Sequence, residues 1–329
     1  MEIALDLIYQ VAILFLMMVP GVILKKCRLC CEHFAKGLSG LVLYIAQPAL
    51  IFLAYLRPYD KTVFINCLWV LALALFAHLL FAGAALLFYR KASDGQKRIL
   101  RLATVFGNAA FMGVPMVGVL LGAEALLYAS VYNIVFNLFL WSFGVLVCTH
   151  GKDMDGDGDH DEHDRAAIKR DILLMVRRTL LHPVTLAAAL GLVFFFLPIE
   201  DAVPDLLIDS ISMLSNLVAP LAMMVIGLRL SDIRFKGFFR DTSALLCIAL
   251  RHLVLPLAVI GATKLLSLAG APISTTVVKV VVILAATPVA TSASMFAERY
   301  DCDACYAGKI VTVSTVLSIV TMPLLLLLM

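Results

Sequence analysis

The chain has 329 residues, of which 62% are hydrophobic and only 15% are charged, and its mean hydropathy is +1.00. Soluble domains are roughly 45–50% apolar and about 25% charged. The composition therefore excludes a soluble enzyme, a disordered protein, a collagen and a coiled coil, and it indicates a helical membrane protein. The formal net charge of +3 is small, and we expect no nucleic-acid partner.

Ten apolar runs are long enough to cross a membrane, which takes about 20 mostly apolar residues in a helix. The runs do not alternate between apolar and polar residues, so they predict helices rather than the strands of a barrel. Glu2 and Asp6 stand before the first run, where a signal peptide would carry basic residues, so we expect this run to stay in the protein. The predicted spans are 3–24, 38–57, 62–89, 99–121, 124–148, 172–197, 206–230, 241–267, 274–297 and 306–328.

The basic residues are unevenly distributed between the connecting loops. Of the 26 Lys and Arg residues, 21 lie in or beside the odd-numbered connections, within 25–36, 90–101, 152–178, 229–240 and 299–309. Loops rich in Lys and Arg stay in the cytoplasm. We therefore expect a multi-pass protein of the cytoplasmic membrane with both termini on the extracytoplasmic side.

This orientation divides the chain into two halves of five spans. Because each half crosses the membrane an odd number of times, the second half would be inverted relative to the first. We expect the first five-helix repeat at 1–148, a cytoplasmic acidic linker loop at 149–171, and the second, inverted five-helix repeat at 172–329.

Prolines within the spans support such a duplication. The separation from Pro48 to Pro115 is 67 residues, and that from Pro220 to Pro288 is 68. Transporters built from inverted repeats often carry interrupted helices at the bilayer midplane. We therefore predict broken fourth and ninth spans, in which Pro115 and Pro288 each begin a second half-helix. Such half-helix N-termini suit an anion. A plain kink at each proline is the alternative.

Polar residues near these prolines are candidate substrate ligands. Asn108 lies seven residues before Pro115, so two helical turns place it on the same face. Hydroxyl groups follow Pro288 and are able to cap an open helix end. Asparagines and hydroxyls also hold membrane helices together, and this alternative remains open. The candidate set is Asn108, Gly113, Pro115, Thr287, Pro288, Thr291, Ser292, Asn133, Asn137 and Asn216.

Four groups of motifs occur in the order seen in one transporter family. They are Gly107-Asn108 with Gly113-x-Pro115, Pro220 through Gly227-Leu228-Arg229-Leu230, Pro288 through Ala297-Glu298-Arg299-Tyr300, and Ser314-Thr315 with Ser318 through Thr321-Met322-Pro323. In these motifs the whole chain resembles the auxin efflux carrier family. The short connection at 149–171 resembles that of the prokaryotic branch, which argues against auxin itself as the substrate.

The resemblance implies a fold and a function. The fold is all-α and polytopic, with ten transmembrane helices in two inverted five-helix repeats, and broken helices 4 and 9 cross at Asn108, Pro115 and Pro288. Helices 1, 2, 6 and 7 would form a scaffold against which the other helices carry a small organic anion, such as malate or malonate, by elevator-like alternating access. The alternative is a sodium- or proton-coupled symporter of a larger organic anion, similar to the bile-acid symporters. We expect no enzyme activity and no cofactor; the partners are the anion and the lipid bilayer, with a homodimer left open.

Ionisable residues inside the spans are further candidates, because a charge in the membrane is costly. They are His78, Arg251, His252 and Lys279. Arg251, His252 and Lys279 also have a simpler interpretation as residues that reach toward the membrane surface. His78 suits either a proton relay or a buried hydrogen bond. Because no carboxylate pair is visible in the spans, uniport and proton coupling both remain open.

Two groups of residues raise the question of metal binding. Cys27-x-x-Cys30 with Cys31 and Cys302-x-x-Cys305 lie on predicted cytoplasmic loops, so disulfides are not expected, and a shared zinc site is a minor alternative. The linker loop opens like an EF-hand calcium loop, although its twelfth position is Asp rather than Glu. We favour a solvated linker over a calcium site made of Asp153, Asp155, Asp157, Asp159 and Asp164.

Overall fold

A computed structural model describes residues 2–31, 33–89, 92–149, 180–197, 203–230, 238–300 and 302–328. These residues form helices, and one isolated antiparallel β-bridge joins Gly107 and Val289. By length and composition, seven helical segments are able to cross a membrane. An all-helical, polytopic membrane protein is thus confirmed, while the count of ten crossings stays a prediction. Three shorter apolar helices span Ala109–Leu121, Pro183–Phe196 and Thr275–Ala285.

Helices of the first half follow the predicted spans closely, although several are divided. A turn separates α1 from α2, and Phe106–Asn108 separate α6 from the π-helical turn Ala109–Gly113. At the start of α5, Asp60 accepts hydrogen bonds from the backbone N–H groups of Thr62 and Val63, which hold the pKa of its carboxyl below the usual range. The helices are α1 Glu2–Leu16, α2 Val19–Lys26, α3 Phe34–Leu41, α4 Gln47–Tyr55, α5 Lys61–Leu87, α6 Asp94–Val105, α7 Val114–Leu121, α8 Ala123–Phe139 and α9 Val145–Thr149.

Helices of the second half also lie within or near the predicted spans. A turn at Asn216 and Leu217 separates α12 from α13, and residues 286–291 separate α16 from α17. Asp241 caps α14 by accepting from the backbone N–H groups of Ser243 and Ala244. The helices are α11 Pro183–Phe196, α12 Asp205–Ser215, α13 Val218–Leu230, α14 Thr242–Ala249, α15 Leu255–Leu268, α16 Thr275–Ala285, α17 Ser292–Arg299 and α18 Ala304–Leu326.

Wider helical turns accommodate three of the intramembrane prolines. The π-helical turns Val42–Ala46, Ala109–Gly113 and Leu250–Val254 each end two residues before a proline, at Pro48, Pro115 and Pro256. A proline has no N–H and its ring presses on the carbonyl one turn earlier. The wider turn moves that carbonyl away, so the helix continues through the proline instead of breaking there.

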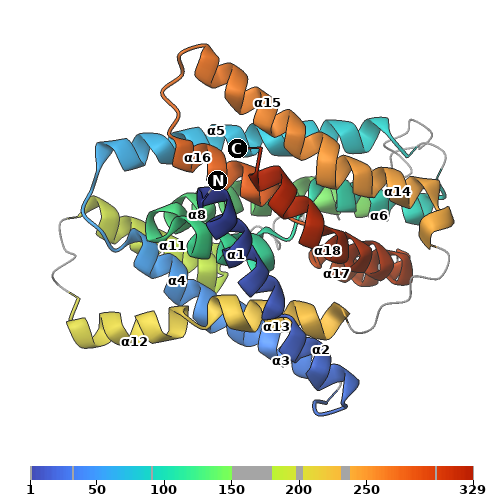
Figure 1. Cartoon of the computed structure of the whole chain (residues 1–329), viewed down its shortest axis with the longest axis horizontal. Helices are drawn as coiled ribbons and strands as arrows, with labels where there is room; N and C mark the ends of the chain where they lie inside the picture. The colour runs from blue at the N-terminus through green and yellow to red at the C-terminus, as the bar shows by residue number, and fades with distance from the viewer. Residues whose placement is uncertain are drawn as a thin grey trace, which may run out of the picture.

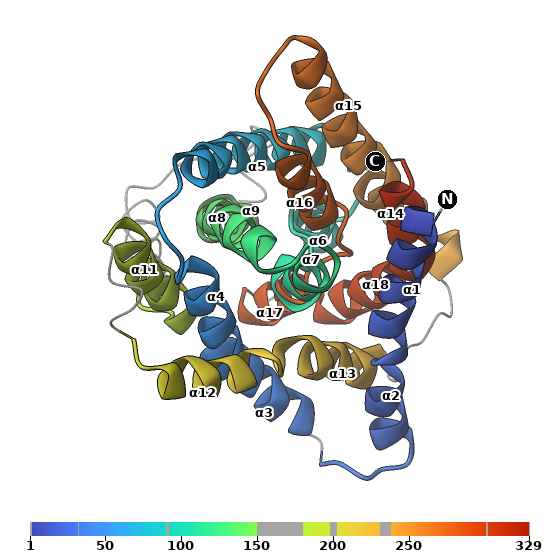
Figure 2. The ribbon, with the colours of Figure 1, turned by 60° about the vertical axis from the view of Figure 1, so that its left-hand side comes forward.

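The closest helix contacts link the two halves of the chain. Helix α2 packs on α13 so tightly that a Cβ on Gly21 would meet the carbonyl of Met224, and one on Gly227 would meet the carbonyl of Met18. Helix α11 packs on α4 in a similar way, because a Cβ on Gly191 would lie 2.6 Å from the Cβ of Tyr55. Figure 2 shows these four helices along one side of the molecule.

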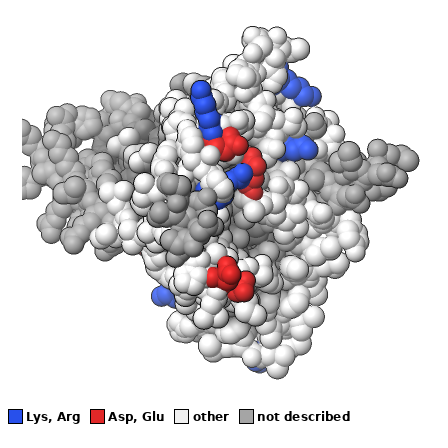
Figure 3. All heavy atoms as spheres, turned by 90° about the vertical axis from the view of Figure 1, so that its left-hand side faces the viewer, with Lys and Arg blue, Asp and Glu red and all other residues white. Residues whose placement is uncertain are grey.

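A second group of helices surrounds the interrupted segments. Helices α6, α7, α16 and α17 pack with α5, α8, α14 and α18, and Figure 2 shows α7 and α8 near the middle of the view. The two chain ends lie close together, and α1 contacts α18 (Figure 1). Figure 3 views the end of the molecule at which α5 and α12 begin, and a few acidic and basic side chains gather near the middle of that face. Along α5, α12 and α15 many apolar side chains are exposed, as expected for helices surrounded by lipid.

Candidate substrate site at the helix crossing

Two interrupted helices meet at their breaks. The backbone N–H of Asn108 donates to the carbonyl of Pro288 at 2.6 Å, and the N–H of Ala290 donates to the carbonyl of Phe106 at 2.9 Å. These bonds flank the antiparallel bridge between Gly107 and Val289. Extended backbone at membrane depth must have its polar groups satisfied by protein or water. The pairing of the two breaks satisfies four of those groups at once.

The positions predicted for the breaks were wrong in detail. Pro115 lies in the first turn of α7, seven residues after Asn108, and the helix is interrupted before Ala109 rather than at this proline. Pro288 lies within the second break, and α17 begins at Ser292. Because the bridge pairs Gly107 with Val289, Pro115 and Pro288 are not in equivalent positions. The nearly equal proline spacing is therefore no evidence of duplication.

Arg251 occupies the space beside both breaks. Its Nε donates to the carbonyl of Thr287 at 3.0 Å, and its Nη1 donates to the carbonyls of Thr104 at 3.4 Å and Val105 at 3.3 Å. Its Nη2 donates to Oγ1 of Thr287 at 3.4 Å, and the guanidinium carbon lies 5.1 Å from the ring centre of Phe81. The side chain is 1% exposed. The interpretation of Arg251 as a residue that reaches the membrane surface is wrong.

The first break leaves no room for a side chain at residue 107. A Cβ on Gly107 would meet Nη2 of Arg251 and Oγ1 of Thr287. Glycine at this position therefore lets the backbone approach the guanidinium.

A hydrogen-bonded chain supports the second break. The backbone N–H of Val289 donates to Oγ of Ser314 at 2.8 Å, and this oxygen lies 2.7 Å from Nε2 of His252. The other ring nitrogen of His252 lies 2.8 Å from Oγ1 of Thr321. His252, like Arg251, is therefore buried next to the crossing rather than at the membrane surface. Ser314 and Thr321 belong to the C-terminal motif, but their spacing alone does not reveal which backbone group they reach.

A small cavity lies against the crossing. It measures about 20 Å³ and is lined by Asn108, Thr291 and Arg229 together with residues of α13 and α18. A space of this size holds roughly one water molecule. Asn108 and Thr291, predicted on separate spans, are thus brought together, and Arg229 joins them from α13. Arg229 also lies 3.5 Å from Oγ of Ser39, to which it donates through Nη2.

Two buried polar atoms near the crossing have no hydrogen-bond partner among the described residues. They are Oε1 of Gln47 and Oγ of Ser292. Gln47 is 2% exposed, and its Nε2 donates to the carbonyl of Ala110 at 3.3 Å, just after the first break. Buried polar atoms without partners are uncommon and call for an explanation. Gln47 was absent from the predicted set, although it precedes Pro48 in the sequence.

The other candidates lie at varying distance from the cavity. Gly113 packs against Leu284 and Thr287, so it belongs to the crossing as a contact position. On α8, Asn133 is buried, and Asn137 donates through Nδ2 to the backbone carbonyl of Asn133 at 2.9 Å. Asn216 is exposed at the turn between α12 and α13. Neither the asparagine pair nor Asn216 lines the cavity.

The remaining ionisable candidates are placed as follows. His78 is buried on α5, where its Nδ1 lies 2.8 Å from the carbonyl of Ala74, in agreement with the buried hydrogen bond considered above. Lys279 is half-buried on α16. The cysteines are free, and the described residues contain no cluster of His, Cys, Asp or Glu that is able to hold a metal. The acidic linker, including Asp153, Asp155, Asp157, Asp159 and Asp164, lies outside the described residues.

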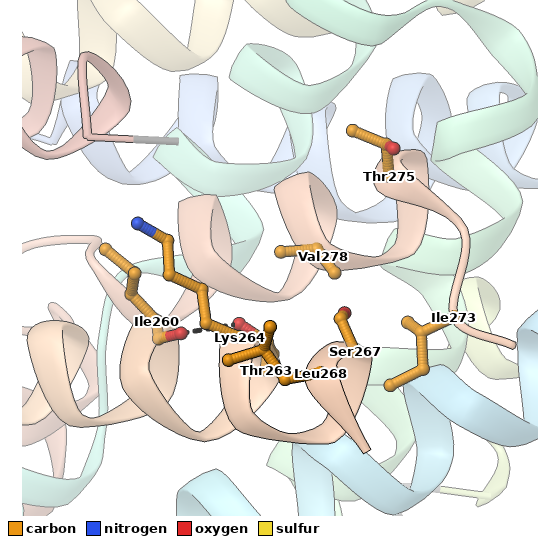
Figure 4. Close-up of a pocket in the computed structure, with 8 residues that line it drawn as sticks. All are labelled: Ile260, Thr263, Lys264, Ser267, Leu268, Ile273, Thr275 and Val278. Carbon is orange, nitrogen blue, oxygen red and sulfur yellow. Dashed lines mark hydrogen bonds between the residues drawn. The ribbon is translucent and has the colours of Figure 1, made fainter. Parts of the chain in front are cut away.

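A larger cavity of about 430 Å³ lies between α15 and α16, away from the crossing (Figure 4). Its lining combines apolar side chains with Thr263, Lys264, Ser267 and Thr275. Nζ of Lys264 donates to the carbonyl of Leu328 at 3.4 Å. None of the predicted site residues lines this cavity.

Comparison with known proteins identifies the family of this chain. A family model described as a membrane transport protein matches residues 6–326. The chain belongs to this family. It is the auxin efflux carrier family that the sequence motifs resemble, and its members are transporters rather than enzymes.

Two similar proteins come from archaea. An uncharacterized transporter of Methanothermobacter thermautotrophicus is 26% identical over 306 residues, which is 92% of each chain. An uncharacterized transporter of Methanocaldococcus jannaschii is 24% identical over 270 residues, which is 79% of this chain and 80% of that protein. Both relatives of this auxin efflux carrier family member are named as transporters without a substrate.

Proposed function

We propose that this membrane transport protein is a secondary transporter of a small organic anion, such as a mono- or dicarboxylate, with its binding site at the helix crossing. The observation that carries the proposal is the cavity lined by Asn108, Thr291 and Arg229 beside the paired breaks. Both helices resume there, at Ala109 and at Ser292. Their N-terminal ends carry partial positive charge, which favours an anion.

The charges around the cavity support an anion over a cation. Arg229 lines the cavity, Arg251 lies at the breaks, and the cavity lining contains no carboxylate. Each cation raises the local potential in a region of low dielectric. A carboxylate substrate would therefore gain from Arg229, which lines the cavity, whereas a cation would be repelled. The alternative, a coupled symporter of a larger anion, finds no specific support in this small site.

The composition of the cavity wall supports alternating access. Ile226, Arg229 and Leu230 come from α13, in the proposed scaffold, while Asn108 and Thr291 come from the two interrupted helices. The site thus lies at the boundary between the two groups of helices. Because about 20 Å³ is too small for a carboxylate, binding requires that this boundary opens. An elevator-like movement of the crossing helices past α13 would open it.

The helix packing supports two inverted repeats of five helices. In the first half α4 packs on α11, and in the second half α13 packs on α2, so each half lends one helix to the other. Likewise α5 packs on α16 as α14 packs on α6. A two-fold relation between halves 1–148 and 172–329 explains these reciprocal pairs. Together with the loop charges, it favours ten crossings, with both termini extracytoplasmic and the linker in the cytoplasm.

Flux measurements on purified protein in liposomes test the site. We expect Asn108→Ala to lower malate or malonate uptake by at least about tenfold, because a hydrogen bond to a charged group contributes about 1.5–3 kcal/mol. Asn216→Ala is the matched control, since this asparagine is exposed and lines no part of the cavity. Both variants should melt within a few degrees of the native protein. Equal flux in the two variants would exclude the crossing as the binding site.

A further inference from the structure

Backbone carbonyls of the end of α6 and of the second break point at one guanidinium. The final four carbonyls of a helix have no partner within that helix. Helix α6 ends at Val105, so Thr104 and Val105 supply two of its last carbonyls, whereas Thr287 lies in the second break, two residues after α16 ends at Ala285. All three carbonyls accept hydrogen bonds from the guanidinium of Arg251. The C-terminus of α6, with about half a negative charge, and an unwound carbonyl of the second break therefore meet inside the protein.

Transporters with interrupted helices commonly bind an exchangeable cation at such carbonyl ends. Here we infer that Arg251 is a positioning residue, whose tethered charge takes the place of an exchangeable cation and holds both interrupted helices in register. The guanidinium is permanently charged and distributes its donors over a plane. It reaches α6 and the segment after α16 from a third element, the π-helical turn Leu250–Val254. The two breaks and this turn are thereby joined.

The contacts of Arg251 also indicate that it does not bind the substrate directly. Its Nε, Nη1 and Nη2 are engaged by Thr104, Val105 and Thr287, and the face of Phe81 lies close to it. The side chain does not line the cavity that contains Asn108 and Thr291. Arg251 therefore acts on the substrate site through the backbone geometry of the breaks rather than by direct contact. The effect of Arg251 on the substrate site rests on the proposed function, whereas its structural role in holding the two interrupted helices in register does not.

Thermal melting of the purified protein in detergent tests the structural part without any substrate. The native protein is compared with Arg251→Gln, Arg251→Lys and the control Arg299→Gln, an exposed arginine that stacks over Tyr300. Each is melted in choline chloride, in sodium chloride and in methylguanidinium chloride at constant ionic strength. Glutamine keeps polar groups but no charge, lysine keeps the charge, and the two small cations serve as replacements for the lost guanidinium.

We expect the native protein and Arg299→Gln to melt at the same temperature in choline and sodium. Arg251→Gln should melt about 5 °C or more below the native protein, because several carbonyls lose their partner. Sodium or methylguanidinium should restore part of this loss with a saturable concentration dependence. Arg251→Lys should melt above Arg251→Gln and respond less to either cation.

Three results would overturn the inference. They are saturable stabilisation of the native protein by sodium, a melting temperature of Arg251→Gln equal to that of Arg299→Gln, and a lysine variant no more stable than the glutamine variant. If Arg251→Gln yields no folded protein while Arg251→Lys does, the requirement for a charge is supported, and the native protein's response to sodium still decides on exchangeable cations. Failure of the native protein to transport any carboxylate would reject the proposed function and leave these melting results unaffected.

Discussion

The two breaks reach the same paired geometry by different local means. The first, at Phe106–Asn108, contains no proline and depends on the close approach of Gly107 to Arg251. The second, at residues 286–291, is longer, contains Pro288 and receives a side-chain acceptor from Ser314. At the first break the packing leaves room only for a hydrogen atom on the Cα of Gly107. At the second break Pro288 and the hydroxyl of Ser314 determine the backbone conformation. Equivalent structure thus does not require equivalent residues.

This difference has a consequence for function. Asn108 of the first break and Thr291 of the second line the same cavity, but the first break is buried throughout, whereas Thr291 is partly exposed and Ser292, next to it, has a buried oxygen without a partner among the described residues. We therefore expect the first break to be the less tolerant of substitution. The second break has more polar groups available for a ligand, and three substitutions would sharpen the comparison.

Gly107→Ala should have the largest effect. The new methyl group would displace Nη2 of Arg251 and Oγ1 of Thr287, at a cost of about 3 kcal/mol for overpacking alone. The measurement is the melting temperature, together with the fraction of protein that elutes as a single species from gel filtration. Gly83→Ala is the control, because a Cβ on Gly83 in α5 meets no atom within 4 Å. Equal melting temperatures of the two variants would show that the first break has room for a methyl group at residue 107.

Ser314→Ala should have an intermediate effect. It leaves the buried N–H of Val289 without its acceptor, which costs about 1–3 kcal/mol. Uptake should fall as well, since the second break would lose its register. The control is Ser318→Ala on the same helix, whose hydroxyl donates to the carbonyl of Thr315 and lies 3.9 Å from Sδ of Met112, but contacts no backbone group of the second break. If the two serine variants melt and transport alike, the side-chain acceptor contributes nothing to the break.

Pro115→Ala should have the smallest effect. Pro115 lies in the first turn of α7, directly after the π-helical turn Ala109–Gly113, which moves away the carbonyl on which the proline ring would press. We expect a change of less than about 1 kcal/mol in stability and little change in flux. Pro288→Ala should cost more, because Pro288 keeps Thr287 out of helical geometry and its loss would let α16 continue. A larger loss for Pro115→Ala than for Pro288→Ala would restore the original assignment of the break to Pro115.

Much of the helical structure followed from local patterns. Long apolar runs predicted helices such as α5 and α18 closely, because a backbone in lipid must satisfy its hydrogen bonds within the segment. The same reasoning failed at Pro115, because a single proline is compatible with a break, a kink or a wider turn. In the structure the helix accommodates Pro115 by a π-helical turn, and no residue pattern in the sequence predicts this turn.

Part of the candidate site was also predictable. Asn108, Thr287, Pro288 and Thr291 all lie at or beside the crossing, and their role in binding stays a prediction. Arg251 and His252 were noticed as ionisable residues, but their apparent distance from the span's centre favoured the membrane surface. Gln47 was missed, since a glutamine in a span has no distinctive spacing. Which face of each helix points inward could not be derived from spans that are apolar all round.

By itself, the sequence determined an all-helical membrane protein, the approximate limits of its helices and its membership of a transporter family. Hydropathy suffices for these because the bilayer acts on each segment separately. Only the tertiary structure decided where the two helices break, that Gly107 and Val289 pair there, and that Arg251 reaches carbonyls at the end of α6 and in the second break. Those features join residues far apart in the chain, and their energy comes from partners that no local pattern identifies.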